Sequence, residues 1–172
     1  MLGGEHYEPT PLNAEVELIA EFPTHTAYHI WIDAFDGVRA YGVMLVPKGK
    51  GPFPALACIH GMGGTPESVC GLTEKRDYHN RFGLQAIQRG YVAFAPLDMN
   101  SGTKRTWLDR KAIMLGQRLQ ALEQFKVQRV VDYLSGRDDV DDKRTGAYGI
   151  SWGGRTVMYL AALDQRVATS TT

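Results

Sequence analysis

Ser151 is the middle residue of a Gly-x-Ser-x-Gly pattern that spans residues 149–153. A segment able to form a buried strand precedes the pattern at 144–148, and an apolar, helix-compatible segment follows at 154–163. A serine on a sharp strand-to-helix turn presents its hydroxyl at the carboxyl edge of a sheet, and flanking glycines allow the strained backbone of such a turn. The pattern favours a catalytic nucleophile at Ser151. The alternative is a glycine-rich turn that only needs a small residue there.

A second glycine-rich segment, residues 60–64, follows an apolar run at 55–59. Acyl transfer passes through an oxyanion, and each N–H group aimed at it lowers the barrier by about 3–4 kcal/mol in favourable cases. Such donors come from the residue after the nucleophile and from the loop after an upstream strand. We therefore predict an oxyanion hole made by the backbone N–H groups of Met62 and Trp152. The alternative is a flexible glycine-rich turn without a catalytic role.

The residues around Met62 are expected to support this loop. Gly61 and Gly63 allow the Met62 amide to point into the site. His60 is predicted to prop the loop by hydrogen bonds rather than to act as the base for Ser151.

Three further candidates receive structural predictions. His79 is placed on a helix or at its entry, in a surface or packing role. Asp98 follows a buried strand and reaches the carboxyl edge of the sheet, where we expect it to make structural hydrogen bonds. Asp164 is the only Asp or His after Ser151, and it is predicted to pair with Arg166 or to end a helix rather than to join a catalytic triad.

Composition describes a neutral protein of one-domain size. The 172 residues carry 19 basic and 19 acidic side chains. This balance argues against a nucleic-acid or membrane-surface partner, which would require a basic bias. The N-terminus has no secretory signal pattern, and no apolar run reaches the roughly 18 residues of a membrane span, which predicts a cytoplasmic location. Cys58 and Cys70 fit no metal or redox spacing, and Cys58 is expected to be a buried free thiol.

The N-terminal part of the chain predicts strands. Residues 1–13 form a loose polar lead-in, and residues 14–172 form one incomplete domain. Residues 15–22 alternate as a half-buried strand does, with Val16, Leu18, Ala20 and Phe22 on one face. Two further strands, at 28–33 and 38–46, flank the turn signal Asp36-Gly37 and predict an antiparallel hairpin.

Strands and helices alternate in the rest of the chain. The apolar runs 55–59 and 91–95 predict strands buried on both faces, with a helical stretch between them that ends near Gly90. Apolar residues recur at helical spacing over 107–134, with a break near Gly116 or Phe125. The pattern predicts an α/β fold with a mostly parallel sheet and helices on both faces.

These segments, in this order, resemble the α/β-hydrolase superfamily, and within it the dienelactone hydrolase and acetyl xylan esterase-like branch. The matching segments are 53–55, 60–64, 90–98, 130–134, 138–142, 149–154 and 161–167. The resemblance implies a three-layer α/β-hydrolase-type sheet with an N-terminal antiparallel hairpin. It also implies hydrolysis of a small-molecule carboxylic ester with no metal or organic cofactor. Dienelactone hydrolases carry cysteine as the nucleophile, so Ser151 favours the esterase side.

The chain departs from this family after the nucleophile. Family members continue for further strands, whose loops carry the acid and the histidine of the triad. With these C-terminal strands missing, the elbow strand lies near an open sheet edge, where self-association is possible. We predict little or no turnover by this chain alone. Three hypotheses stay open: a serine ester hydrolase active only in a longer parent, a non-catalytic pseudo-hydrolase used in binding or assembly, and complementation by a second chain.

Overall fold

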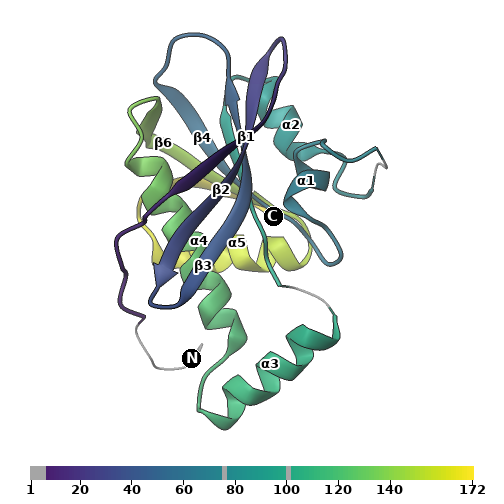
Figure 1. Cartoon of the computed structure of the whole chain (residues 1–172), viewed down its shortest axis with the longest axis vertical. Coiled ribbons are helices and arrows are strands. Elements are labelled where there is room, and N and C mark those ends of the chain that lie inside the picture. Colours follow the sequence, from purple (N-terminus) through teal and green to yellow (C-terminus); the bar gives the residue numbers. More distant parts are fainter. Residues whose placement is uncertain (1–6, 75–76, 100–101) are drawn as a thin grey trace.

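A seven-stranded mixed sheet with helices on both faces forms the protein (Figure 1). The structure is a computed structural model, and it describes residues 7–74, 77–99 and 102–172. The strands are β1 (Glu15–Glu21), β2 (His25–Phe35), β3 (Val38–Pro47), β4 (Phe53–Ile59), β5 (Val92–Pro96), β6 (Val140–Gly149) and β7 (Val167–Thr171). The helices are α1 (Pro66–Val69), α2 (Phe82–Ile87), α3 (Thr103–Met114), α4 (Leu119–Ser135) and α5 (Trp152–Leu163).

The strand order β1-β2-β3-β5-β4-β6-β7 joins an antiparallel and a parallel part. β1, β2 and β3 form an antiparallel meander, and β3 also pairs antiparallel with β5. β5, β4, β6 and β7 are mutually parallel. The predicted α/β architecture with its N-terminal hairpin is therefore confirmed. The hairpin turn lies at Asp36 and Gly37, between β2 and β3.

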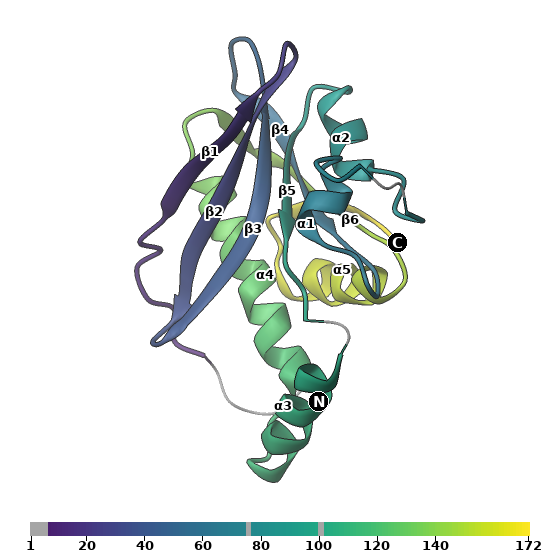
Figure 2. The same cartoon turned by 45° about the vertical axis from the view of Figure 1, so that its right-hand side comes forward.

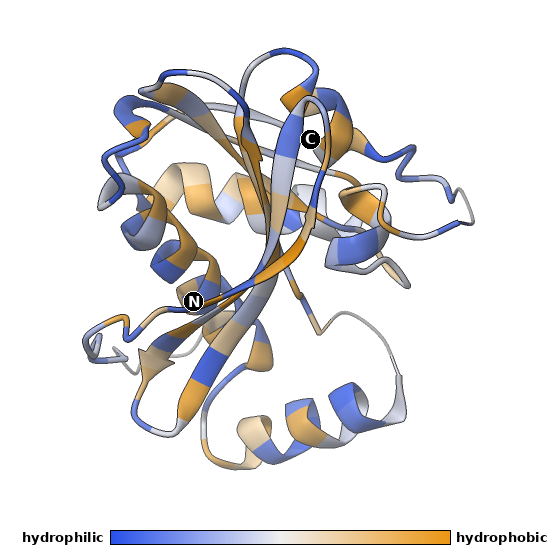
Figure 3. Cartoon of the chain, turned by 45° about the horizontal axis from the view of Figure 1, so that its top comes forward, coloured by the Kyte–Doolittle hydropathy of each residue, from blue (hydrophilic) through white to orange (hydrophobic). Residues whose placement is uncertain are grey.

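Helices cover the two faces of the sheet separately, as Figure 2 shows. α1 and α2 lie on one face, over a core that includes Val43, Cys58 and Phe82. α4 and α5 lie on the other face, where apolar residues of the strands meet Val130 and Leu160. Hydrophobic residues run along the central strands between these layers (Figure 3). Because β4 and β5 are covered on both faces, their sequences read as continuous apolar runs.

The helical segments differ from the expected ones in their limits. The stretch before Gly90 contains two short helices, α1 and α2, rather than one. The long helical pattern at 107–134 breaks at Gly116, which has φ 73°, and Phe125 lies inside α4. None of the described residues of α3 is buried, and Trp107 is 57% exposed. This helix lies beyond the end of the sheet (Figures 1 and 2), so its apolar residues have no layer to pack against.

The first half of the face predicted to be buried in β1 is exposed, whereas Phe22 at its end packs against the core. Val16 is 51% exposed and Leu18 is 55% exposed. Both point to the face on which α4 packs, but α4 contacts β2 and β3, farther from the sheet edge. The alternating pattern therefore marked an edge strand whose apolar side is largely uncovered.

The described part of the lead-in, residues 7–13, packs on the domain rather than lying loose. The rings of Tyr7 and Phe35 stack with centroids 4.7 Å apart. The Asp33 N–H donates to the Leu12 carbonyl at 2.8 Å. Cys58 and Cys70 are both buried free thiols, as expected for Cys58. Within the described ranges, no helix has the length and apolar character to cross a membrane.

Candidate active site

Ser151 occupies a strained turn between β6 and α5. β6 ends at Gly149, α5 begins at Trp152, and Ser151 between them has φ 57° and ψ −114°. A non-glycine residue with positive φ is uncommon, and it persists only where the surrounding structure enforces it. Gly153 is part of that enforcement, because a Cβ atom there would lie 2.1 Å from the carbonyl oxygen of Ile59. The end of β4 thus presses directly on the start of α5. The Ser151 side chain is exposed.

The loop after β4 forms a tight turn beside this elbow. The Gly64 N–H donates to the Gly61 carbonyl at 3.1 Å, and Gly63 has φ 75°, as the third residue of a type II turn requires. A Cβ atom on Gly61 would lie 2.8 Å from the carbonyl oxygen of Ile150. In the parallel ladder, Ile59 and Gly149 are register partners. The two segments predicted to hold the nucleophile and an oxyanion donor therefore emerge side by side from adjacent strands.

His60 is fully buried beneath this turn. Its Nδ1 atom lies 3.0 Å from the Gly61 carbonyl oxygen, and its Nε2 atom accepts the Asp98 N–H at 3.0 Å. Burial lowers the pKa of the His60 imidazole, and the nearby imidazole of His79 adds to the effect. A neutral ring fits both contacts, with the proton on Nδ1 and the lone pair on Nε2. Because both nitrogens are engaged, His60 is not positioned as the base for Ser151.

Of the two roles predicted for His79, surface or packing, the structure excludes the surface one. It is 1% exposed, and its Nε2 atom accepts the Gly61 N–H at 2.8 Å. Its Nδ1 atom lies 2.9 Å from the Asp77 carboxylate, and the neighbouring Tyr78 hydroxyl donates to the Met62 carbonyl at 2.9 Å. Residues 77–79 lie between α1 and α2, where one helical stretch was expected. An Asp-x-His pattern shortly after a glycine-rich loop was the available signal.

A buried carboxyl pair lies behind His60. Asp98 is 3% exposed, its Oδ2 atom accepts the Thr156 hydroxyl at 3.4 Å, and its backbone N–H binds His60. This confirms the hydrogen-bonding role expected for Asp98. Glu123 of α4 is 5% exposed and accepts the Met99 N–H at 3.2 Å. Burial raises the pKa of Glu123 to about 7, and the charge of Asp98 adds to this effect. No sequence pattern marks Glu123, which lies inside a helical repeat.

Trp152 is flanked by two arginines. The guanidinium carbon of Arg155 lies 3.6 Å from the centroid of the indole ring, and that of Arg105 lies 4.6 Å away. Burial is the largest cause that lowers the pKa of Arg155, and the charge of Arg105 adds to it. Trp152 is the first residue of α5, and the first N–H groups of a helix have no intrahelical acceptor. The backbone N–H of Trp152 therefore makes no hydrogen bond within the helix, which an oxyanion donor requires.

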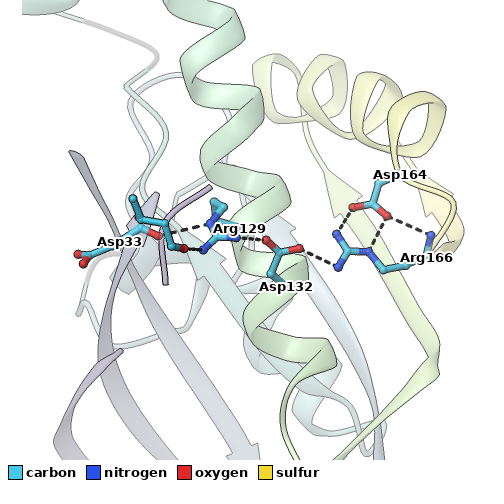
Figure 4. A network of polar contacts seen from close by, with 6 residues as sticks. Asp33, Arg129, Asp132, Asp164 and Arg166 are labelled. Atoms are coloured by element: carbon cyan, nitrogen blue, oxygen red, sulfur yellow. Dashed lines mark hydrogen bonds and ion pairs between the residues drawn. The ribbon is translucent and has the colours of Figure 1, made fainter. Parts of the chain in front are cut away.

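Asp164 is committed to an ion-pair network away from the elbow (Figure 4). Its carboxylate accepts from Arg166 Nε at 2.8 Å and Nη2 at 2.6 Å, and Arg166 Nη1 lies 2.7 Å from Asp132. Burial alone would raise the pKa of Asp164, but the hydrogen bonds from Arg166 outweigh it and hold the pKa below its ordinary value. The predicted pairing with Arg166 is confirmed. The network continues through Asp132 to Arg129 of α4.

A groove of about 570 Å³ lies next to the elbow, on the face of the sheet that carries α2. Ile150, His79 and Phe82 line it, together with Tyr148 of β6 and Thr169 of β7. Ser151 and Met62 do not line this groove. It therefore lies beside the predicted reaction centre, and we assign it no part in the chemistry.

Comparison with known protein families gives a match over most of the chain. The family model described as the dienelactone hydrolase family matches residues 41–172. The protein YtaP of Bacillus subtilis (strain 168), which its name assigns provisionally to the hydrolases, is 25% identical over 172 residues. The match covers 95% of this chain and 58% of YtaP.

Solved structures share the fold. A crystal structure from Bacteroides fragilis NCTC 9343, provisionally assigned as an acetyl xylan esterase, superposes with a TM-score of 0.81 at 19% identity and covers 94% of this chain and 48% of that one. Acetyl xylan esterase 1 from Thermoanaerobacterium sp. JW/SL YS485 gives a TM-score of 0.72 at 19% identity, over 94% of this chain and 52% of that one. The chain spans about half the length of the relatives it matches.

Proposed function

The chain belongs to the dienelactone hydrolase family, and from this premise we propose that it carries the nucleophile and the oxyanion hole of a serine carboxylic-ester hydrolase. In this proposal the Ser151 hydroxyl attacks the ester carbonyl, and the N–H groups of Met62 and Trp152 stabilise the resulting oxyanion. Collapse of this intermediate releases the alcohol and leaves an acyl-serine. Water then attacks the acyl-serine and releases the acid.

The observation that supports this proposal is the strained backbone of Ser151 beside the turn that carries Met62. Strain at a single exposed serine, enforced by backbone contacts from a neighbouring strand, is typical of functional sites. Acetyl xylan esterases among the structural relatives make acetyl esters of saccharides the first substrate class to test.

A base for Ser151 is the part that the described residues do not supply. The ring nitrogens of His60 and His79 are engaged by other groups, and Asp164 is paired with Arg166. A serine without its histidine loses most of its rate, although oxyanion donors and binding leave about 10³–10⁴-fold over water. We therefore expect very slow turnover of a simple acetyl ester by this chain alone.

This observation keeps the non-catalytic pseudo-hydrolase as a second candidate. Complementation by another chain that supplies the base remains a variant of the first. The serine hydrolase and the pseudo-hydrolase differ in one testable property, which is whether an added base makes Ser151 react as a nucleophile.

Covalent labelling with a fluorophosphonate probe, read by intact mass, tests the proposal. We expect slow labelling at Ser151 in the folded protein, acceleration by added imidazole acting as an external base, and no labelling of Ser151→Ala. Labelling no faster than in urea-unfolded protein would reject the nucleophile and favour the pseudo-hydrolase. Fast stoichiometric labelling without imidazole would show that a base is present and would reject the incomplete site.

A further inference from the structure

Three consecutive peptide groups around Met62 are each bound by a side chain. His79 Nε2 accepts the Gly61 N–H at 2.8 Å, and His60 Nδ1 lies 3.0 Å from the Gly61 carbonyl oxygen. The Tyr78 hydroxyl donates to the Met62 carbonyl at 2.9 Å. Within the described ranges, no acceptor is recorded for the Met62 N–H. The side chains fix the backbone on both sides of this N–H and leave it available to a ligand.

The direction of the Met62 N–H follows from these contacts. In a trans peptide the carbonyl of one residue and the N–H of the next point in opposite directions. His60 Nε2 accepts the Asp98 N–H, so Nδ1 carries the proton and donates it to the Gly61 carbonyl. Because the Gly61 carbonyl points at the buried His60, the Met62 N–H points away from the core.

His79 holds the other end of Gly61 with the same tautomer. Its Nε2 atom is an acceptor for the Gly61 N–H, so the ring proton lies on Nδ1, which faces the Asp77 carboxylate at 2.9 Å. The Asp77 carboxylate in turn accepts the His79 backbone N–H at 3.0 Å. The Asp77 carboxylate therefore lies against the Nδ1 side of the ring, at ion-pair distance but without an aligned hydrogen bond from Nδ1. The lone pair on Nε2 is used by the backbone amide of Gly61.

We infer that His79, oriented by Asp77, is a positioning residue for the oxyanion hole. As a neutral acceptor it holds Gly61, and through Gly61 it holds the Met62 N–H toward the position where the oxyanion forms. A side chain without an acceptor leaves the buried Gly61 N–H unpaired, and the turn rotates to satisfy it. The inference rests on the proposed function for its catalytic consequence, whereas the hydrogen-bond arrangement can be measured without any reaction.

Nitrogen-15 NMR of the histidine side chains tests the arrangement in the unmodified protein. We expect a protonated Nδ1 and an unprotonated Nε2 for both His60 and His79 at neutral pH. A proton on Nε2 of His79 would overturn the inference, because that atom could no longer accept the Gly61 N–H.

A pair of substitutions at His79 separates positioning from base catalysis. In His79→Gln the amide oxygen replaces Nε2 as the acceptor, whereas His79→Leu has no acceptor. We expect the fluorophosphonate labelling rate at Ser151 to fall about 100-fold in His79→Leu, as for a lost oxyanion donor, and to stay within about threefold of the original in His79→Gln. Equal losses in both variants would reject the inference, since a base or a purely structural residue would not be rescued by glutamine.

Two further variants complete the experiment, the first as a control for damage to the fold and the second as a test of the Tyr78 contact. His25→Leu removes another buried histidine, 5% exposed and located in β2, and should leave the labelling rate unchanged. Tyr78→Phe removes only the hydroxyl that binds the Met62 carbonyl from a side chain that is 55% exposed. We expect it to lower the labelling rate about threefold to tenfold with an unchanged unfolding midpoint. An unchanged labelling rate in Tyr78→Phe would contradict the role of these contacts in aiming the amide.

Amide hydrogen exchange separates the failure of this inference from the failure of the proposed function. If Ser151 is not labelled in the original protein, the proposed function fails, but exchange at the Gly61 N–H still reports on His79. Protection in the original protein and in His79→Gln, with loss in His79→Leu, supports the inference. Equal protection in all three proteins overturns it.

Discussion

The two sides of the candidate site differ in how firmly they are held. The predicted oxyanion loop at 60–64 is bound by buried histidines, by the Tyr78 hydroxyl and by its own turn hydrogen bond. Ser151, on the other side, is exposed on a strained backbone. The outer side of α5, which follows it, exposes large apolar residues, namely Met158, Tyr159 and Leu163. The hydrogen bonds that hold the 60–64 loop come from described residues, whereas the side of the site that carries Ser151 and α5 has much uncovered surface.

This difference shows which part of the proposed chemistry is local. The side chains described above as binding the predicted oxyanion loop come from residues 60–79, the segment between β4 and α2. The proposed nucleophile, Ser151, is positioned by β6 and by the end of β4, but a base for it has to approach from the exposed side. The following predictions test this contrast, in order of decreasing expected effect.

Gly153→Ala should be the most damaging of these changes. The new Cβ atom would meet the Ile59 carbonyl at 2.1 Å, and backbone atoms on both sides cannot move away independently. We expect the free energy of unfolding, measured by urea denaturation, to fall by about 3 kcal/mol. Gly154→Ala is the matched control, because its Cβ atom would first meet the Thr172 side chain at 3.2 Å. A loss in Gly154→Ala as large as in Gly153→Ala would mean that the contact with β4 is not what matters.

Glu123→Gln should change how stability depends on pH. The pKa of Glu123 is raised to about 7 in the folded protein, so folding binds a proton between the ordinary value near 4.5 and this raised value. The stabilising contribution of this group is complete below pH 4.5 and is lost as the pH rises through 7. We expect Glu123→Gln to reduce the loss of unfolding free energy between pH 4.5 and pH 8 by about 3 kcal/mol. Parallel pH profiles for the two proteins would contradict the raised pKa.

Substitutions of Ser151 should reveal the strain on the nucleophile side. Glycine adopts φ 57° without the penalty that a side chain incurs, whereas alanine retains the penalty. We expect Ser151→Gly to have a free energy of unfolding about 1–2 kcal/mol higher than Ser151→Ala, by the same urea titration. Equal stabilities would show that this backbone conformation is not strained.

Thr65→Ala should weaken the oxyanion side slightly. The Thr65 hydroxyl accepts the Ser68 N–H at 3.2 Å and caps α1 directly after the loop. We expect a loss of about 1 kcal/mol in unfolding free energy. Thr103→Ala at the start of α3, where no side chain caps the helix, is the control and should change stability by less than about 0.5 kcal/mol. Equal losses in Thr65→Ala and Thr103→Ala would show that the cap at Thr65 does not stabilise the protein specifically.

The sequence predicted the elements that depend on local patterns. Apolar runs marked β4 and β5, the turn signal placed the hairpin, and the glycine pattern located Ser151 between strand and helix. These signals succeed because burial on both faces and tight turns each require particular residue types.

The sequence failed where a residue's environment depends on distant elements. His79 binds Gly61, 18 residues earlier, across two helices that were expected to be one. Val16 and Leu18 are exposed because α4 packs nearer the middle of the sheet, which no pattern in β1 can reveal. Burial of Glu123 likewise follows from its contact with Met99 and not from its place in a helical repeat. Each failure concerns a contact between elements.

The pairing register of β4 and β6 sets the distance between the two sides of the candidate site, and that register can change only by whole residues. Ile59 pairs with Gly149, and each strand leads directly into one side of the site. A slip of one residue moves a strand by about 3.3 Å and turns its side chains to the opposite face, whereas catalytic groups tolerate errors of only about 0.5 Å. The distance between the residues that follow β4 and those that follow β6 therefore cannot be changed in small steps by shifting the strands. The pairing is already irregular before Ala55 and Thr145, but one residue added or lost in the continuous register that follows would misalign the two sides in a single step.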